Sequence, residues 1–416
     1  MTYSSEAVFQ SICCDDTILN DEGVRAHVQP IYATSTFVYP GPEKAIRIFD
    51  ETEARPYLYN RWGTPNTALV EAKVAALEAC GIVDGNGPLQ LEAVLFGSGM
   101  AAISALFLSL GLRGGDYIIT QGNLYGTTVE FLDVILARQG VRIVYGDLHN
   151  LSWLEDQLSI NRCVKLIYIE TPTNATSRCY DIAALSGMAK KYGVKCAVDS
   201  TLATPYLQQP FRHGADFVIH SATKFLNGHS NALAGVVIGR DPQFTKSEVW
   251  RMRKVLGGSV GSFDAWLLNM GMKTLPLRMK KHSENAQKVA EFLEGDEHVF
   301  RVSYLGLPSH PDHEMARRQM SAFGGVLSFE VRGGREAAIR VMKSIQICTL
   351  TATLGAMDTL LQHPASMTHI KVPREQREQH GIMDGLLRLS IGIEDADLII
   401  ADLRQALKEV DCSKAS

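Results

Sequence analysis

The chain has 416 residues, of which 46% are hydrophobic and 21% are charged, with 41 Lys and Arg against 45 Asp and Glu. This length exceeds one ordinary domain and the composition is that of a globular protein, which excludes a short binding module and a disordered chain. The net charge of −4 includes no basic block, so nucleic acid is not expected as a partner. No apolar run approaches the roughly 20 residues that span a bilayer, so a membrane is not expected either.

The eight cysteines are scattered along the chain and form no C-x-x-C pair. In a chain of this size we expect them to be reduced and mostly buried, rather than joined in a disulfide framework. The first residues also lack the basic and apolar segments of a secretory signal. These features indicate a cytoplasmic protein.

Residues 1–66 lack strong periodicity and are rich in Pro, Tyr and Thr, so we expect an extended arm that reaches a neighbouring subunit. Residues 67–80 (TALVEAKVAALEAC) place Ala, Leu and Val on one stripe, which predicts a helix. Residues 81–92 are rich in Gly and predict an inserted loop.

From residue 92 onward, short β-rich runs alternate with helical stretches over about 150 residues. Strands are predicted at residues 93–96, 117–120, 141–146, 164–170, 194–200, 217–221 and 234–239. These runs are apolar throughout, which indicates a mainly parallel sheet that helices cover on both faces. Ligands of such α/β sheets bind at the carboxyl ends of the strands.

A long helical stretch at about residues 264–294 is broken near Pro276. Further strands are predicted at 324–331, 347–352 and 386–393, separated by helical segments. This part predicts a smaller C-terminal α+β domain. The chain therefore divides into an arm (1–66), a large α/β domain (67–270) and a C-terminal domain (271–416).

The loop after the first predicted strand, Gly97–Ala102 (GSGMAA), opens a helix and matches the dinucleotide fingerprint G-x-G-x-x-A. The acid that should bind a ribose at the end of the next strand is missing, because Gln121 stands there. An NAD-dependent oxidoreductase is therefore a distant alternative. Small residues at a helix N-terminus still allow backbone N–H groups to approach a phosphate.

Two charged residues follow neighbouring buried strands: Asp199 follows one and Lys224 the next. A pyridoxal 5′-phosphate (PLP) site needs a lysine for the Schiff base, an acid that keeps the pyridinium nitrogen protonated, phosphate donors and an aromatic ring against the cofactor. Lys224, Asp199 and Tyr125 can supply the lysine, the acid and the ring. The Gly97–Met100 turn and the hydroxyls of the SATK segment at 221–224 can supply the phosphate donors.

Five motifs closely resemble those of the Cys/Met-metabolism PLP enzymes: YNRWG at 59–63, ETPTN at 170–174, SATK at 221–224, DAWLL at 264–268 and HPASMTH at 363–369. The resemblance extends over nearly the whole chain. It implies an aspartate-aminotransferase-like fold of type I, in which the large domain binds PLP. It also implies a homotetramer made of two catalytic dimers.

The resemblance implies a role for each candidate residue. Lys224 would form the Schiff base and Asp199 would bind the pyridinium nitrogen. Asn174 would bind the ring hydroxyl, while Tyr125 would stack on the ring and take part in proton transfer. The remaining cofactor ligands would be Ser98, Gly99, Met100, Ser221 and Thr223, with Tyr59 and Arg61 from an adjacent subunit.

For the substrate, the resemblance implies that Arg388 binds the carboxylate and that the backbone of Thr353 and Leu354 helps to hold the amino acid. Ala352 stands where cystathionine enzymes commonly carry an acidic residue that recognises a distal amino group, which argues against cystathionine. Thr127 replaces a cysteine that is typical of bacterial methionine γ-lyases.

The implied reaction is γ-elimination or γ-replacement on methionine or an O-acylated homoserine, through a vinylglycine-type intermediate. Its products would be 2-oxobutanoate and ammonia, or a new γ-substituted amino acid. A β- or γ-lyase acting on cystathionine or cysteine is the alternative that shares every catalytic residue. No metal site is expected, because residues 310–314 (HPDHE) match no zinc motif and instead predict a surface loop.

Overall fold

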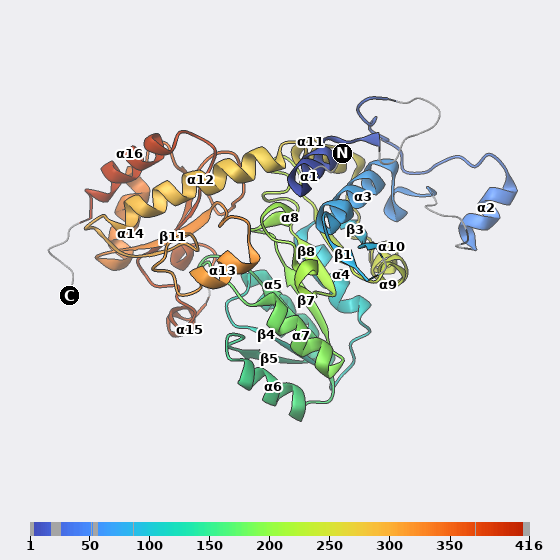
Figure 1. Cartoon of the computed structure of the whole chain (residues 1–416), viewed down its shortest axis with the longest axis horizontal. Coiled ribbons are helices and arrows are strands. Elements are labelled where there is room, and N and C mark those ends of the chain that lie inside the picture. Colours follow the sequence, from blue (N-terminus) through green and yellow to red (C-terminus); the bar gives the residue numbers. More distant parts are fainter. Residues whose placement is uncertain are drawn as a thin grey trace.

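The computed structural model describes residues 4–17, 26–50, 52, 57–85, 87–370 and 372–410, and its largest feature is a seven-stranded sheet (Figure 1). The strand order is β3–β9–β8–β7–β6–β4–β5. The strands are β3 (Glu92–Phe96), β4 (Tyr117–Gln121), β5 (Arg142–Gly146), β6 (Val164–Glu170), β7 (Lys195–Asp199), β8 (Phe217–His220) and β9 (Gly235–Gly239). Only β9 runs antiparallel to its neighbours, so the prediction of a mainly parallel sheet is confirmed.

Helices cover both faces of this sheet, and successive strand residues enter two different hydrophobic cores. The covering helices include α3 (Pro65–Ala79), α4 (Gly99–Ser109), α5 (Gly126–Glu130), α6 (Leu151–Ile160) and α7 (Ile182–Tyr192). Ile167 and Ile169 of β6 belong to the core that includes α3 and α7. Leu166 and Tyr168 belong to the core that includes α4. Because both faces are buried, every strand position can be apolar, which explains the uninterrupted apolar runs.

The C-terminal part of the chain forms a second sheet of five strands in the order β10–β11–β14–β13–β12. They are β10 (Val299–Ser303), β11 (Val326–Val331), β12 (Thr349–Leu350), β13 (Leu360–Gln362) and β14 (Leu386–Ser390). The predicted strands correspond to β11, β12 and β14. β10 and β13 were not predicted, because β10 exposes much of its length and β13 has three residues.

Helices pack on this second sheet, and one of them, α12, leads from the large domain to it (Figure 1). They are α12 (Leu275–Glu294), α14 (Gly334–Ser344) and α16 (Ala396–Leu407). The buried Ala316 of α13 (His313–Gln319) joins the core of the large domain, and α15 (Arg374–Gln379) lies between β13 and β14 in the chain. The predicted break near Pro276 lies between α11 (Ser262–Met272) and α12. Pro276 is in the first turn of α12, where no intrahelical N–H bond is lost.

The expectation of an extended conformation is wrong for the first residues of the chain. Ser5–Cys14 form α1, and the Ser4 hydroxyl caps it by accepting a hydrogen bond from the Ala7 N–H at 3.2 Å. Phe9 and Cys13 enter the core of the large domain, because their helical spacing places both on one face. In the described part of residues 26–64 the helices are α2 (Pro42–Phe49), which projects from the body in Figure 1, and a 3-10 helix at Asn60–Trp62.

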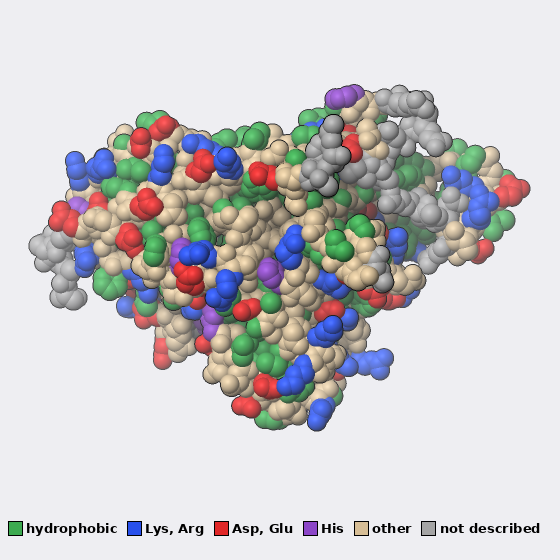
Figure 2. Space-filling model, in the orientation of Figure 1, with side chains coloured by type: hydrophobic (Ala, Val, Ile, Leu, Met, Phe, Trp, Pro, Cys, Tyr) green, Lys and Arg blue, Asp and Glu red, His purple; other side chains and the backbone are tan. Residues whose placement is uncertain are grey.

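The remaining elements are short. Residues 81–92, predicted as an inserted loop, contain a hairpin of the two-residue strands β1 (Val83–Asp84) and β2 (Gly87–Pro88). The other helices are α8 (Thr204–Leu207), α9 (Pro242–Phe244) and α10 (Trp250–Leu256). Among the described helices, none combines the length and apolar character needed to cross a membrane. Acidic and basic side chains are interspersed over the face that Figure 2 shows.

A buried ion pair holds the residues after α1 against α3 and α11. Lys73 Nζ of α3 lies 3.1 Å from Asp16 Oδ1, and the two side chains are 0% and 3% exposed. Lys73 Nζ also donates to Asn269 Oδ1 at 2.6 Å, and Lys273 Nζ lies 2.7 Å from Asp16 Oδ2. Two charges can remain buried here because both carboxylate oxygens and the ammonium group have partners.

Lys73→Met should lower the free energy of unfolding by about 3 kcal/mol, because the buried Asp16 and Asn269 would both lose the ammonium group that bonds to them, and Asp16 would keep only Lys273. Urea-induced unfolding of the variant and the wild type measures the difference. Lys191→Met is the matched control, since Lys191 is 62% exposed and pairs with Glu155 in solvent. The control should unfold like the wild type. An unchanged midpoint for Lys73→Met would contradict a stabilising role for the pair.

Candidate active site

Lys224, which follows β8, lies against the loop that precedes β13. Its Nζ donates a hydrogen bond to Thr353 Oγ1 at 2.9 Å. A Cβ atom on Gly355 (φ +82°) would come within 2.7 Å of the Phe225 nitrogen, so the loop approaches this closely only because the position is glycine. Burial and the nearby charge of Arg388 lower the pKa of Lys224. A lowered pKa increases the fraction of neutral, nucleophilic amine.

Asp199, at the end of β7, is a buried acid with a fixed orientation. Its Oδ1 accepts hydrogen bonds from Thr201, from the backbone N–H at 3.0 Å and from the hydroxyl at 2.5 Å. The Tyr168 hydroxyl donates to Oδ2 at 3.4 Å. Burial raises the pKa of Asp199, whereas the bonds from Thr201 favour its charged form. A cationic N–H placed beside this carboxylate would stabilise the charged form further.

The N-terminus of α4 provides unused hydrogen-bond donors beside Ser221. Among the described residues, no acceptor binds the backbone N–H groups of Gly99 and Met100. A Cβ atom on Gly99 would lie 2.7 Å from the Ser221 Cβ, so the glycine allows the helix terminus to touch Ser221. Free N–H groups at the positive end of a helix, next to a hydroxyl, form a site that fits a phosphate.

Two other predicted phosphate ligands use their hydroxyls within the chain. Ser98 Oγ caps α4 by accepting the Ala101 N–H at 3.0 Å, which leaves its proton available to a ligand. Thr223 Oγ1 donates to the Ala234 carbonyl at 3.1 Å and accepts the Ala234 N–H at 3.0 Å. The Thr223 proton is therefore already in use, and this hydroxyl must exchange partners before it can bind a phosphate.

Arg388 of β14 is 2% exposed, and its guanidinium keeps N–H groups for a ligand. One terminal nitrogen donates to Asn174 Oδ1 at 3.0 Å and the other to the Thr353 carbonyl at 2.6 Å. Its Nε has no hydrogen-bond partner among the described residues. Burial lowers the pKa of Arg388 to about 10. A buried guanidinium with an unused N–H fits a carboxylate, which would supply the missing acceptor and the opposite charge.

Tyr125 lies at the N-terminus of α5 with its ring 45% exposed, and its phenol has no hydrogen-bond partner among the described residues. Its backbone N–H donates to Glu170 Oε2 at 2.7 Å. The Asn174 N–H donates to the other oxygen of the same carboxylate at 3.0 Å. Glu170 was not predicted as a site residue, although it is an acid at the end of β6 next to Asp199 at the end of β7, which is a usable signal.

Tyr59 and Arg61 lie apart from this cluster. Tyr59 pairs with Thr36 of the extended segment, and the Arg61 guanidinium lies 5.5 Å from the Tyr59 ring centroid. Arg61 also donates to the backbone carbonyl of Lys254 in α10. In the described part of this chain their contacts are with the arm and α10, and not with Lys224.

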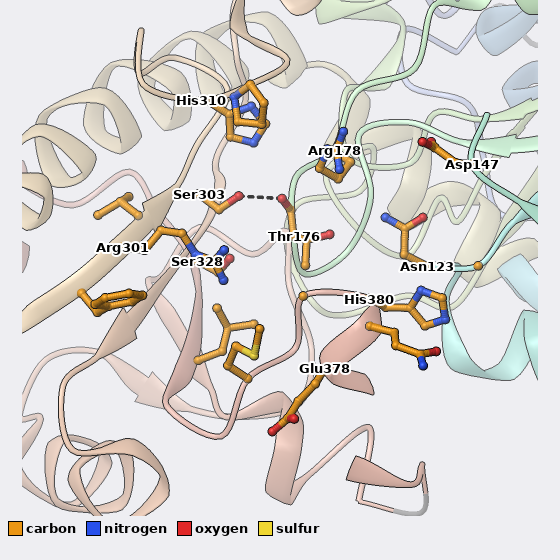
Figure 3. Close-up of a pocket in the computed structure, with 18 of the residues that line it drawn as sticks. Asn123, Asp147, Thr176, Arg178, Arg301, Ser303, His310, Ser328, Glu378 and His380 are labelled. Carbon is orange, nitrogen blue, oxygen red and sulfur yellow. Dashed lines mark hydrogen bonds between the residues drawn. The ribbon is translucent and has the colours of Figure 1, made fainter. Parts of the chain in front are cut away.

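Figure 3 shows a cavity with a volume of about 920 Å³. It opens between loops of the large sheet and strand β10, and the Ser303 hydroxyl donates across it to the Thr176 carbonyl at 2.6 Å. Thr176 is two residues from Asn174, so one segment borders both the cavity and the candidate site. Lys224 and Asp199 do not line this cavity.

The prediction of a surface loop at residues 310–314 is wrong. His310 and Asp312 are buried. Asp312 accepts hydrogen bonds from Arg178 at 2.6 and 3.2 Å and from the Cys179 N–H at 3.0 Å, so the segment anchors the C-terminal domain to the large domain. Burial lowers the pKa of His310. Within the described ranges, no group of three or more His, Cys, Asp and Glu side chains could hold a metal ion.

Comparison with known proteins identifies the family. The family model for Cys/Met metabolism PLP-dependent enzymes matches residues 12–408. The chain belongs to this family. It is 41% identical over 382 residues to an L-methionine gamma-lyase of Fusobacterium nucleatum subsp. polymorphum, covering 92% of this chain and 93% of that protein.

Two further relatives carry other names within the family. The chain is 41% identical over 394 residues to a cystathionine beta-lyase of Lactococcus lactis subsp. cremoris, covering 94% of this chain and 97% of that protein. Its structure matches that of cystathionine gamma-lyase from Lactobacillus plantarum complexed with L-serine, with a TM-score of 0.87, 34% identity and coverage of 97% and 99%. The fold is therefore the type I fold of PLP-dependent lyases, and PLP is the cofactor.

The residues at the strand ends fit PLP. The free N–H groups of Gly99 and Met100 beside Ser221 can hold its phosphate. The buried carboxylate of Asp199 can hold its ring nitrogen, and Lys224 is near enough to the C-terminal loop to meet both cofactor and substrate. A buried site with separate places for a phosphate, a cation and a carboxylate matches this cofactor and an amino acid.

Arg388→Lys should raise the KM for an amino-acid substrate about tenfold or more, with a smaller change in kcat, because a lysine cannot reproduce the planar guanidinium donors. Steady-state kinetics on the PLP-loaded enzyme provides the measurement. Arg240→Lys is the control, since Arg240 donates to the backbone carbonyls of Ala215 and Phe211 at the far side of the sheet. An unchanged KM for Arg388→Lys would show that this side chain does not bind the carboxylate.

Proposed function

We propose that this enzyme catalyses γ-elimination on L-methionine, releasing methanethiol, 2-oxobutanoate and ammonia, or the related γ-replacement on an O-acylated homoserine. The observation that carries the proposal is the buried guanidinium of Arg388, which has an unused Nε. Arg388 and Lys224 both donate hydrogen bonds to Thr353, Arg388 to its carbonyl and Lys224 to its hydroxyl. The 41% identity to an L-methionine gamma-lyase over 92% of the chain favours methionine.

The proposed roles follow from the contacts of each side chain. PLP, once bound, supplies an electron sink that makes the substrate Cα proton acidic. The Arg388 guanidinium binds the substrate carboxylate, and the Thr353 and Leu354 segment holds the amino acid beside Lys224. The Lys224 amine, which its lowered pKa keeps available as a base, takes the proton from Cα. The Thr353 hydroxyl orients that amine through the 2.9 Å hydrogen bond.

The leaving sulfur needs a proton, and Tyr125 is the proposed donor. Its phenol has no hydrogen-bond partner among the described residues, so no internal acceptor competes for the proton. The exposed ring is also available to stack on the cofactor. Asp199 keeps the ring nitrogen of the cofactor protonated, and Asn174 binds its ring hydroxyl. Ser98, Gly99, Met100, Ser221 and Thr223 form the phosphate site.

A second candidate is β-elimination on cystathionine or cysteine, which the 41% identity to a cystathionine beta-lyase favours. Ala352 argues against cystathionine. Enzymes that act on cystathionine commonly have an acidic residue at this position, before Thr353, which binds the distal ammonium of the substrate, whereas the methyl group of Ala352 cannot. A buried ammonium without a carboxylate partner costs several kcal/mol. Methionine and O-acylated homoserines have no distal ammonium, so Ala352 suits them.

Product analysis of the PLP-loaded enzyme with methionine, O-acetylhomoserine, cystathionine and cysteine tests this function, each with and without an added thiol. With methionine we expect methanethiol, 2-oxobutanoate and ammonia in equal amounts. Pyruvate from cysteine or cystathionine, with methionine untouched, would establish the β-lyase instead. A protein that binds NAD and shows no PLP absorbance would overturn both candidates.

We also propose that residues 1–66 include an arm that completes the site of a neighbouring subunit, beside a PLP-binding domain (67–270) and a C-terminal domain (271–416). Tyr59 is 41% exposed, and the apolar side chains of Ile46 and Phe49 in α2 are 60% and 64% exposed. Tyr59 and Arg61 would bind the phosphate in a homotetramer of two catalytic dimers. The free cysteines of the described part are consistent with a reducing, cytoplasmic setting.

Mixing two inactive variants tests the shared site. Arg61→Ala should impair only the neighbour's phosphate site, whereas Lys224→Ala should abolish turnover in its own subunit. Co-expressed in equal amounts, the two variants should recover about one quarter of the wild-type activity, because half the dimers are mixed and each has one intact site. Mixing Arg61→Ala with wild-type-like Lys191→Met controls for expression. Absence of any recovery in the first mixture would contradict a site shared between subunits.

A further inference from the structure

The carboxylate of Glu170 joins two segments that border the candidate site. Its Oε2 accepts the backbone N–H of Tyr125, from the loop after β4, at 2.7 Å. Its Oε1 accepts the backbone N–H of Asn174, from the loop after β6, at 3.0 Å. One buried side chain therefore fixes the start of the helix that carries Tyr125 and the turn that carries Asn174.

The backbone of Glu170 is fixed by a second pair of bonds. The Glu170 N–H donates to Gln121 Oε1 at 3.1 Å, and Gln121 Nε2 donates to the Glu170 carbonyl at 2.7 Å. Gln121 ends β4 and Glu170 ends β6, so the reciprocal bonds hold these strand ends in register. Because the Glu170 backbone is held in this way, its carboxylate has a fixed position and can place neighbouring groups precisely.

Glu170 also lies beside Asp199, its partner in the pairing of β6 with β7. Burial and the charge of Asp199 raise the pKa of Glu170. The other titratable groups that face this pair are Tyr168, whose hydroxyl donates to Asp199, and His220 of β8, which is paired with Glu78 of α3 at 2.6 Å. Two neighbouring buried acids favour a cation close by.

We propose that Glu170 is a positioning residue for the cofactor ring: its two oxygens set the relative placement of Tyr125 and Asn174, and its carboxylate adds to the negative field around Asp199. The Asn174 side chain in turn accepts a hydrogen bond from Arg388, so Glu170 is also linked, through Asn174, to the arginine proposed to bind the substrate. This inference rests on the proposed function only in taking PLP as the group that occupies the site.

The test is Glu170→Gln in the full-length protein loaded with PLP. A glutamine can accept one of the two backbone N–H groups, while its NH₂ faces the other, so one bond is lost. We expect the dissociation constant for PLP to rise about tenfold. We also expect the visible circular dichroism per bound cofactor to fall, because the ring is less constrained. The pH midpoint of its absorbance change should move lower, because a negative charge is gone.

The matched control is Asp402→Asn. Asp402 of α16 is also a buried carboxylate that accepts backbone N–H groups, from Gln346, Ile347 and Cys348 at 2.8 to 2.9 Å, but it lies in the C-terminal domain. The control should lower thermal stability and leave the visible circular dichroism and the pH midpoint unchanged. If Glu170→Gln behaves like this control, Glu170 is purely structural and the proposal is wrong.

If Glu170→Gln does not fold, Glu170→Asp decides the question. The shorter side chain keeps the charge and loses the reach to one N–H group, so the visible circular dichroism should fall while the pH midpoint stays near that of the wild type. Wild-type values for both quantities in Glu170→Asp would overturn the proposal. Failure of the wild-type protein to bind PLP would instead refute the proposed function, so the two failures are distinguishable.

Discussion

The candidate site depends on the burial of two acids and two bases, three of them at the carboxyl ends of the parallel strands and Arg388 on the second sheet. Asp199 and Glu170 are buried acids whose pKa values are raised, and Lys224 and Arg388 are bases whose pKa values are lowered, with burial as the largest cause for each. Each group is thereby poised to gain from a ligand of complementary charge. A ring N–H cation suits the acids and a substrate carboxylate suits Arg388. The buried acids and Arg388 lie at separate places in the site, so the cofactor ring can bind beside the acids while the carboxylate of an amino-acid substrate binds Arg388.

Part of this arrangement could be predicted because strand ends in a parallel sheet meet at one edge. Asp199 and Lys224 follow neighbouring strands, and an uninterrupted apolar run before each residue shows that it emerges from a buried position. Arg388 and Thr353 could not be placed in this way. They lie 129 or more residues from their partners in the site, on a second sheet whose packing against the first leaves no local pattern. Only the resemblance to a family predicted that Arg388 and Thr353 belong to the same site as Lys224.

The errors share one physical origin, which is that local patterns do not reveal tertiary partners. The segment at 310–314 has the composition of a surface loop, yet Arg178 from the large domain buries Asp312 and satisfies it. An extended conformation is expected for residues 5–14, but they form α1, and the buried Lys73 binds Asp16 directly after it. In each case a polar group found its partner far away in the sequence.

Asn174 connects the large domain and the C-terminal domain through its hydrogen bonds. Asn174 belongs to the large domain, where Glu170 fixes its backbone, while its side chain accepts from Arg388 of the C-terminal domain. A ligand carboxylate at the unused Nε of Arg388 would share the guanidinium with Asn174 and so reorient this contact. In the proposed site, substrate binding would therefore affect Asn174, the proposed ligand of the cofactor ring hydroxyl, and through Glu170 also Tyr125, the proposed proton donor. The linkage needs no moving domain, because three consecutive hydrogen bonds connect the substrate-binding arginine to the loop that carries the phenol.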